Sequence, residues 1–188
     1  MQIHEVFLKR GLEPLVKYDF PEGFTIRSYH HGDEENWLNI YMSTDQLNKA
    51  YSTMFREYFG ADQSLLVDRQ FYLSDPDGKP VGTASAWYNR TYHGKEWGRL
   101  HWVAIVPEMQ GRGLAKPLIS HALERLQDLG HKQTYLRTYT VRIVAIKIYW
   151  DLGFVPDLRS QHDKDVWLEF AKENNMLDIE QYVENFSL

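Results

Sequence analysis

Cysteine is absent from the 188 residues of this chain. Its absence excludes disulfide bonds, a thiolate metal site and a cysteine nucleophile. The eight histidines show neither the H-x-x-x-H nor the H-E-x-x-H spacing of zinc sites, so the sequence predicts no metal site. No apolar run approaches the roughly 18 residues of a membrane span, and the first residues lack the basic start and apolar core of a signal peptide. We therefore expect a cytoplasmic protein with no membrane partner.

Positive charge is also scarce, because 21 lysines and arginines are outnumbered by 26 aspartates and glutamates, which leaves a net charge of −5. A nucleic-acid-binding domain usually carries a basic excess, so this balance argues against nucleic acid as a partner. Hydrophobic residues make up 43% and charged residues 25%, which is typical of a globular protein. Since the sequence has no internal repeat, low-complexity tract or linker, we expect residues 1–188 to form one domain.

What the chain does contain is a glycine turn at residues 110–115, between an apolar run and an amphipathic segment. The run 102–106 is short and β-branched, which predicts a buried strand, and Pro107 ends it because proline cannot continue a central ladder. Apolar residues then recur at helical spacing over 114–129. A turn between strand and helix presents backbone N–H groups at a helix N-terminus, where the helix dipole favours an anion such as phosphate.

The residues of the turn suit a phosphate as well. Gly111 and Gly113 leave out the side chains that would keep a phosphate from the amides, and Arg112 and Lys116 add positive charge. A P-loop needs G-x-x-x-x-G-K-[ST], but a proline follows this lysine and no Ser or Thr is placed to hold a metal. A dinucleotide fingerprint needs G-x-G-x-x-G, but its third glycine position holds the same lysine. A third motif, Gln/Arg-x-x-Gly-x-Gly/Ala, fits residues 110–115 fully.

Together with the Val-Pro-Glu at 106–108, this turn resembles the coenzyme A pyrophosphate loop of the GNAT superfamily of N-acetyltransferases. The segment 145–154, AIKIYWDLGF, resembles the later helix of that family, which usually reads Asn-x-x-Ala-x-x-x-Tyr and ends in Leu-Gly-Phe. The usual Asn position holds Arg142, a departure that concerns a contact to the cofactor arm and not the fold. The resemblance covers about residues 24–170, and its specific motifs lie within 100–154.

The resemblance implies a mixed α/β fold whose mostly antiparallel sheet splays open at the cofactor site and is flanked by helices. It also implies acetyl-coenzyme A as the cosubstrate, with its pyrophosphate on the amides of the turn and its pantetheine arm along the strand. The residues implied for cofactor binding are Val103, Ala104, Ile105, Gln110, Gly111, Arg112, Gly113, Leu114, Ala115, Lys116 and Arg142. An N–H of 103–105 would polarise the thioester carbonyl, and a primary amine of a small molecule or peptide would attack it directly in a ternary complex.

His101 lies on the strand that enters the turn, where members of this family often carry the general base or a residue that relays through water. One subgroup, which acetylates arylalkylamines, has a histidine at this position. Strand alternation predicts one face with His101, Val103 and Ile105 and the other with Trp102, Ala104 and Val106. The ordinary pKa of histidine suits proton removal from an ammonium group. A packed or surface histidine fits the sequence equally well, and Glu96 and Glu108 are the other candidates for the base.

Tyr149 stands at the usual tyrosine position of the family, where the resemblance implies that it protonates or holds the thiol of coenzyme A. Its helical spacing from neighbouring apolar residues also fits a core position. Five aromatic residues flank the strands before the turn and could line a pocket for an apolar or aromatic amine, or simply pack. They are Tyr72, Trp87, Tyr88, Tyr92 and Trp97.

A protein that senses or scaffolds acyl-coenzyme A without catalysis is the alternative function. It would keep residues 110–115 and need neither His101 nor Tyr149. The sequence leaves open which amine is the acceptor, and also the oligomeric state, a homodimer included.

Periodicity and turn residues predict the rest of the element order. Ser43 and Gln46 have the spacing of a capping box, which predicts that a second helix begins there and ends at Gly60. The predicted strands are 24–28, 70–74, 81–88, 97–106, 133–138, one from 154, and 166–170. The predicted helices are one from 33, one from 43, 114–129, one containing 145–152, and 177–186.

Overall fold

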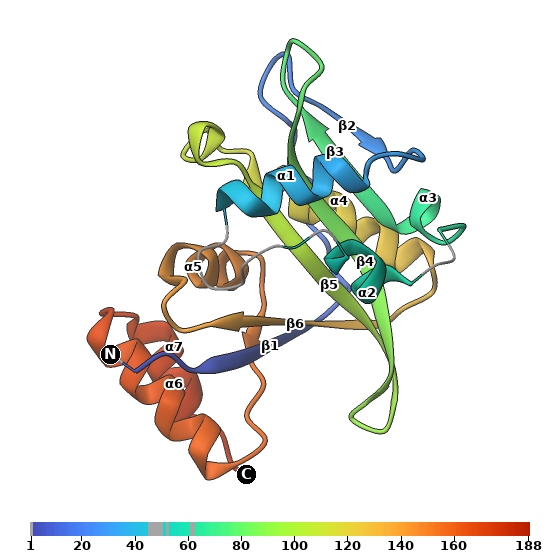
Figure 1. The fold of residues 1–188 in the computed structure, drawn as a ribbon. Helices are drawn as coiled ribbons and strands as arrows, with labels where there is room; N and C mark the ends of the chain where they lie inside the picture. Colours follow the sequence, from blue (N-terminus) through green and yellow to red (C-terminus); the bar gives the residue numbers. More distant parts are fainter. Residues whose placement is uncertain (1, 45–50, 52, 61–62) are drawn as a thin grey trace. The chain divides into compact units, whose positions relative to one another are not determined.

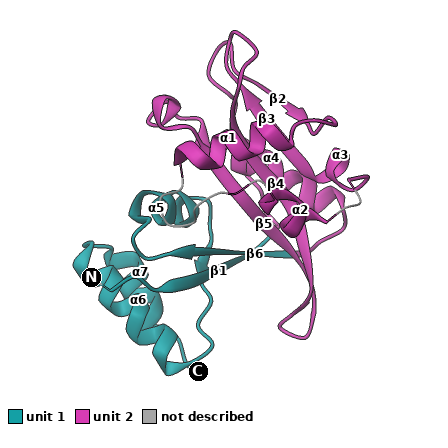
Figure 2. Ribbon diagram, viewed as in Figure 1, with its two compact units in different colours: residues 1–11, 133–188 teal, residues 12–132 magenta. Residues whose placement is uncertain are grey.

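The computed structural model describes residues 2–44, 51, 53–60 and 63–188 (Figure 1). These residues form two compact units, which Figure 2 shows in different colours. Unit 2 is the continuous segment 12–132, and unit 1 joins the first eleven residues to 133–188. Unit 2 therefore contains the whole of the glycine turn and the strand that enters it.

Unit 2 is built on a four-stranded sheet in the order β2-β3-β4-β5, in which every neighbouring pair is antiparallel. Its strands are β2 (Thr25–Ser28), β3 (Gln70–Ser74), β4 (Pro80–Tyr92) and β5 (Lys95–Ile105). Its helices are α1 (Glu34–Thr44), α2 (Met54–Phe59), α3 (Leu66–Arg69), the 3-10 turn η1 (Pro107–Met109) and α4 (Ala115–Asp128). The hairpin turns of this meander contain Gly78 and Gly94, both at positive φ, a conformation that glycine adopts without steric cost.

The two faces of this sheet are covered by different helices, with α1 in front of the strands and α4 behind them in Figure 1. On one face, α1 and α2 bury an aromatic cluster against β3, β4 and β5. We define this aromatic cluster as Tyr29, Trp37, Tyr41, Phe55, Phe59 and Tyr72, with the partly buried Trp87 and Trp102. On the other face, the ring of His121 on α4 packs edge-on against Phe71 of β3 at 4.6 Å.

Unit 1 is a three-stranded antiparallel sheet with β1 in the middle. Its elements are β1 (Glu5–Gly11), β6 (Gln133–Tyr139), α5 (Ile143–Asp151), β7 (Val155–Pro156), α6 (Gln161–Glu173) and α7 (Leu177–Asn185). A buried carboxylate holds part of this unit together, because Asp157 forms a 2.6 Å ion pair with Lys9 of β1.

The mixed α/β fold class is confirmed, but two predictions about elements are wrong. The run 166–170 is not a strand: it lies in α6, which Ser160 caps by accepting a hydrogen bond from the N–H of Asp163. Ser43 does not begin a second helix, because it lies in the last turn of α1 and its hydroxyl donates to the carbonyl of Ile40. Gln46, its predicted partner, lies outside the described residues.

Candidate active site

A β-bulge interrupts β5 beside His101. Register pairs Thr83 with Ala104 and Ser85 with His101, so the single residue between them on β4 lies opposite two residues of β5. The first of those two, Trp102, has a φ of +49°, which is uncommon for a residue other than glycine. A bulge of this kind bends the strand and redirects the side chains that follow.

The predicted alternation of side chains along β5 is therefore wrong. Because Ser85 and Thr83 lie on the same face of β4, their partners His101 and Ala104 also share a face. The extra residue of the bulge shifts the alternation of side chains by one position. The ring of Trp102 lies 5.2 Å from the ring of His101. The same indole packs edge-on against Trp37 at 5.1 Å and Tyr41 at 4.8 Å, both from α1, and against Tyr58 of α2 at 4.6 Å.

The glycine turn follows directly from the end of β5. The side-chain amide of Gln110 donates to the carbonyl of Ile105 over 2.8 Å, which ties the turn to the strand. Gly111 and Gly113 have φ values of +74° and +77°, and both are exposed. A Cβ at either position would meet no heavy atom within 4 Å, so the glycines are needed for backbone conformation and open approach, not for internal packing.

The N-terminus of α4 opens onto this turn. Leu114 is its N-cap residue, and among the described residues no side chain caps it with a hydrogen bond. Backbone N–H groups at such a helix start attract an anion. Arg112 is exposed within the turn, and the Lys116 ammonium lies 5.9 Å from the ring centroid of Tyr18. The backbone and charge of the turn therefore fit the pyrophosphate that the family resemblance implies for it.

His101 is buried, with 7% of its surface exposed, and lies under α2. Its ring centroid is 6.2 Å from those of Tyr58 and Phe59. The structure thus places His101 within an aromatic environment on the face covered by α1 and α2, and excludes a surface position for it. The other candidates for the base lie elsewhere: Glu96 has its carboxylate 3.9 Å from the Nδ1 atom of His131, and Glu108 is exposed in η1.

The aromatic residues near His101 are only partly those that sequence reasoning selects. Tyr72 and Trp87 belong to the aromatic cluster, but Tyr92 and Trp97 pack with His93 near the tip of the β4–β5 hairpin. The arginine of α3, Arg69, lies over the ring of Tyr88. Sequence reasoning places Trp37, Tyr41 and Tyr58 on helices that cover the sheet but does not select them for the site, and it misses the contributions of Phe59 and Trp102. The clearest available signal was the helical spacing of Trp37 and Tyr41.

Tyr149 and Arg142 belong to unit 1. Tyr149 lies within α5, and Arg142 lies at its start. Arg142 is the N-cap residue of α5, and its guanidinium lies 5.3 Å from the ring centroid of Tyr139. Tyr149 is partly buried and packs edge-on against Phe154 at 5.9 Å. Burial raises the pKa of Tyr149 to about 12, and the positive charge of Arg142 opposes that shift. The phenol therefore keeps its proton throughout the neutral range.

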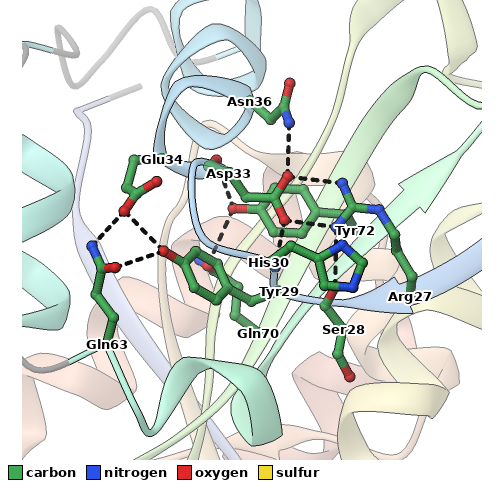
Figure 3. A network of polar contacts seen from close by, with 10 residues as sticks. All are labelled: Arg27, Ser28, Tyr29, His30, Asp33, Glu34, Asn36, Gln63, Gln70 and Tyr72. Atoms are coloured by element: carbon green, nitrogen blue, oxygen red, sulfur yellow. Dashed lines mark hydrogen bonds and ion pairs between the residues drawn. The ribbon is translucent and has the colours of Figure 1, made fainter.

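A polar network anchors the start of α1 to β2 and β3 (Figure 3). The Asp33 carboxylate accepts hydrogen bonds from Arg27 at 2.6 and 2.8 Å, from the N–H of His30 at 2.7 Å and from Asn36 at 2.8 Å. Burial alone would raise the pKa of Asp33, but these hydrogen bonds outweigh it and hold the pKa below its ordinary value. The Tyr72 hydroxyl reaches the Asp33 carbonyl at 3.0 Å, and burial raises the pKa of Tyr72.

Sequence comparisons identify the class of protein. The family model of the acetyltransferase (GNAT) family matches residues 33–154. The chain is 28% identical over 159 residues to a mycothiol acetyltransferase of Streptomyces griseus subsp. griseus, covering 78% of this chain and 48% of that protein. It is 25% identical over 169 residues to an uncharacterized N-acetyltransferase of Methanocaldococcus jannaschii, covering 82% and 69%.

Solved structures show the same fold. A GCN5-related N-acetyltransferase from Sphaerobacter thermophilus superposes with a TM-score of 0.68 at 18% identity, covering 81% of this chain and 48% of that one. The ribosomal-protein-S18-alanine N-acetyltransferase of Escherichia coli gives a TM-score of 0.55 at 21% identity, covering 69% and 76%.

This chain belongs to the GNAT family of acetyltransferases. It spans about half the length of the mycothiol acetyltransferases that it matches. Within the described part of the chain, no group of three or more carboxylate or imidazole side chains is arranged to hold a metal ion. None of the described helices has both the length and the apolar character that crossing a membrane requires.

Proposed function

We propose that this chain is an acetyl-coenzyme A-dependent N-acetyltransferase that acetylates a primary amine of a small molecule or peptide by direct attack in a ternary complex. The observation that carries the proposal is the exposed glycine turn at the start of α4, which no described side chain caps. Membership of the GNAT family supports the same cosubstrate. We also propose that residues 1–188 act as a single catalytic domain, in the cytoplasm.

Acetyl-coenzyme A supplies the thioester that the amine attacks. In the proposal, the amides of residues 111–116 hold its pyrophosphate, and Arg112 and Lys116 add positive charge beside them. The backbone of 103–105, which follows the bulge, takes the pantetheine arm and offers an N–H to the thioester carbonyl. A single donor to a developing oxyanion is worth about 3–4 kcal/mol in well-studied hydrolases, so this contribution is large. Arg142 is assigned to the cofactor by sequence position alone.

His101 is proposed as the general base that takes a proton from the acceptor ammonium. Its burial among aromatic rings supports the role, because an imidazole removed from bulk water can act on a bound amine without competition from solvent. The same aromatic cluster favours an acceptor with apolar or aromatic character. Mycothiol-related amines are a further acceptor class to test, since several curated relatives carry the name mycothiol acetyltransferase.

Tyr149 is proposed to act on the sulfur of the departing coenzyme A. Its pKa of about 12 lies above the ordinary thiol value of about 8.5, so complete proton transfer to the thiolate is unfavourable. A hydrogen bond from the phenol to the developing negative charge needs no such transfer. Hydrogen bonds to charged groups contribute about 1.5–3 kcal/mol. We therefore assign Tyr149 to holding the sulfur while solvent supplies the final proton.

The proposal is tested by measuring release of free coenzyme A from acetyl-coenzyme A across a panel of amines. The panel contains polyamines, arylalkylamines, amino acids, a peptide with a free N-terminus and a mycothiol-related amine. An acetyltransferase releases free thiol with at least one acceptor and forms the acetylated amine in equal amount. A protein that binds acetyl-coenzyme A in calorimetry but releases no thiol with any acceptor would instead be a non-catalytic sensor or scaffold.

A further inference from the structure

Three polar side chains form a row across β3, β4 and β5, on the sheet face that α1 and α2 cover. Register pairs Gln70 with Ser85, and Ser85 with His101. Directly opposed residues in antiparallel strands project to the same face, with their Cβ atoms about 4.5–5.5 Å apart. Gln70 and Ser85 are fully buried and His101 is 7% exposed. The candidate base therefore has two buried polar neighbours that no motif identifies.

Two atoms of this row are buried without a hydrogen-bond partner among the described residues. They are the Oγ atom of Ser85 and the Nε2 atom of Gln70. An unsatisfied buried polar group costs about 1–3 kcal/mol, so native proteins rarely keep one. A buried water, which typically makes about three hydrogen bonds, is the usual solution at a site with several polar groups. The side chains of Gln70, Ser85 and His101 offer such a water three partners.

Tyr72 determines which way the Gln70 amide is turned. Figure 3 shows the Tyr72 hydroxyl between the carbonyl oxygen of Asp33, at 3.0 Å, and the amide of Gln70, at 3.1 Å. A phenol has one hydrogen and a backbone carbonyl can only accept, so Tyr72 donates to Asp33. Its oxygen is then an acceptor, which the NH₂ group of Gln70 satisfies best, and amide orientations are assigned from such networks. The carboxamide oxygen then occupies the unpartnered position.

We infer that Ser85 and Gln70 are positioning residues for His101, which they hold through one buried water bound to one nitrogen of its ring. The inference rests on the proposed role of His101 as the base. The water accepts the ring N–H of His101 and donates to the Gln70 carboxamide oxygen and to Ser85 Oγ. The proton of the neutral imidazole is thereby fixed on one nitrogen, and the lone pair of the other is directed to the acceptor ammonium. When that proton is transferred, the imidazolium keeps its hydrogen bond to the water.

At the end of the row away from His101, an ion pair helps to fix the polar side chains. Tyr72 is held by Asp33, and the Asp33 carboxylate is paired with the guanidinium of Arg27. From the other side, α2 covers His101 with Tyr58 and Phe59, and Arg99 lies two residues before it on β5. With the proposed water, hydrogen bonds would couple the orientation of His101 to the start of α1.

The test compares Ser85→Ala and Gln70→Met with Thr83→Val as a matched control. Thr83 is also fully buried, its hydroxyl is also unpartnered in the described residues, and it lies on the same strand and face, but its partner is Ala104. We expect Ser85→Ala and Gln70→Met to lower kcat/KM about 10- to 100-fold, by analogy with metal-bound histidines that lose an outer hydrogen-bond partner. The acidic limb of their pH profile should move to lower pH, because the imidazolium loses an acceptor.

A second readout does not depend on activity. ¹⁵N spectra of histidine-labelled protein report which ring nitrogen carries the proton, and the signal missing from His101→Gln assigns the residue. We expect one tautomer in the parent and in Thr83→Val, and a mixture in Ser85→Ala and Gln70→Met. If both variants keep the parent tautomer, the positioning role is overturned. If the tautomer shifts as expected but no amine is acetylated by the parent, the positioning role stands and the proposed function fails.

Discussion

The two faces of the sheet in unit 2 differ in the side chains that they bury. The face toward α4 carries only apolar buried side chains on β3, β4 and β5 over its central stretch: Phe71, Leu73, Ala84, Ala86 and Leu100. The face toward α1 and α2 carries polar groups at the same depth: Gln70, Tyr72, Thr83, Ser85 and His101.

The comparison shows which face of the sheet buries polar groups at a cost in stability. Apolar burial contributes about 25 cal/mol per Å², and the central strand positions that face α4 bury only apolar side chains. The opposite face buries hydroxyl and amide groups, and it also contains the bulge that places a tryptophan at positive φ. Departures from local consistency of this kind are expected at functional sites and are rare in plain cores. Substitutions on the two faces should therefore differ in which property they change.

Disabling the turn that follows β5 should have the largest effect. Gly113→Glu places a side chain on a residue at φ +77° and a negative charge at a helix N-terminus, so we expect acetyl-coenzyme A binding to be abolished in isothermal titration. Gly78→Glu is the control, because Gly78 has a similar φ of +80° and equally open surroundings in the β3–β4 turn. Unchanged affinity in a folded Gly113→Glu protein would remove the phosphate-loop assignment.

The next largest effect should come from removing the proposed base, His101, from the polar face. His101→Ala should lower kcat about 10²- to 10⁴-fold, the usual range for loss of a general base, while cofactor affinity stays close to that of the parent. The rate should partly recover at high pH, where the acceptor amine is already neutral. Rates equal to those of the parent across the pH range would make His101 structural.

A substitution on the other side of the sheet should change stability instead of catalysis. Leu126, near the C-terminal end of α4, is fully buried. Leu126→Ala should lower the free energy of unfolding by about 2–5 kcal/mol, through lost transfer energy and the cavity left behind. Urea unfolding measures this, and kcat per folded molecule should be unchanged. A fall in kcat with no loss of stability would contradict the division of roles between the two faces.

The smallest effect is expected in unit 1. Tyr149→Phe removes one hydroxyl and keeps the ring that packs on Phe154, so folding should be nearly intact. We expect kcat to fall about 10- to 100-fold with little change in the KM for acetyl-coenzyme A, which is the pattern of an interaction made chiefly in the transition state. Thiol release from pH 6 to 9 measures this, and the loss should be similar across that range, because the phenol keeps its proton throughout it.

Melting curves serve as the folding control for this variant. Equal kcat values for parent and Tyr149→Phe would assign the residue to the core. A large drop in Tm would show that the hydroxyl supports the fold, and activity would then be compared per folded molecule.

Local patterns predicted much of the fold because they encode local structure. The strand 70–74 is confirmed at both ends, and the helix beginning after the glycine turn is confirmed to within a few residues. The segment 166–170 was misread because Val166, Trp167 and Leu168 are contiguous, which mimics a buried strand. The helical signal was present in the spacing of Val166, Trp167 and Phe170, and in the Ser160 cap.

The candidate site was only partly predictable, for a physical reason. The glycine turn has its own sequence pattern because the positive φ values require glycine. The bulge has none, since Trp102 gives no local hint of positive φ, and the row of Gln70, Ser85 and His101 exists only through strand pairing. Register is set by tertiary packing, and no local window contains it.

The bulge in β5 also affects how this strand should be aligned with other sequences or redesigned. The regular alternation of side chains between the two faces holds from His101 only as far as Trp102. Beyond Trp102 the alternation is shifted by one residue. Deleting one residue there would restore regular pleating. Up to the glycine turn, it would also exchange the side chains that face α1 and α2 with those that face α4. The extra residue therefore shifts the alternation of the strand, so that side chains from His101 and from the strand end that leads into the turn face the same side of the sheet.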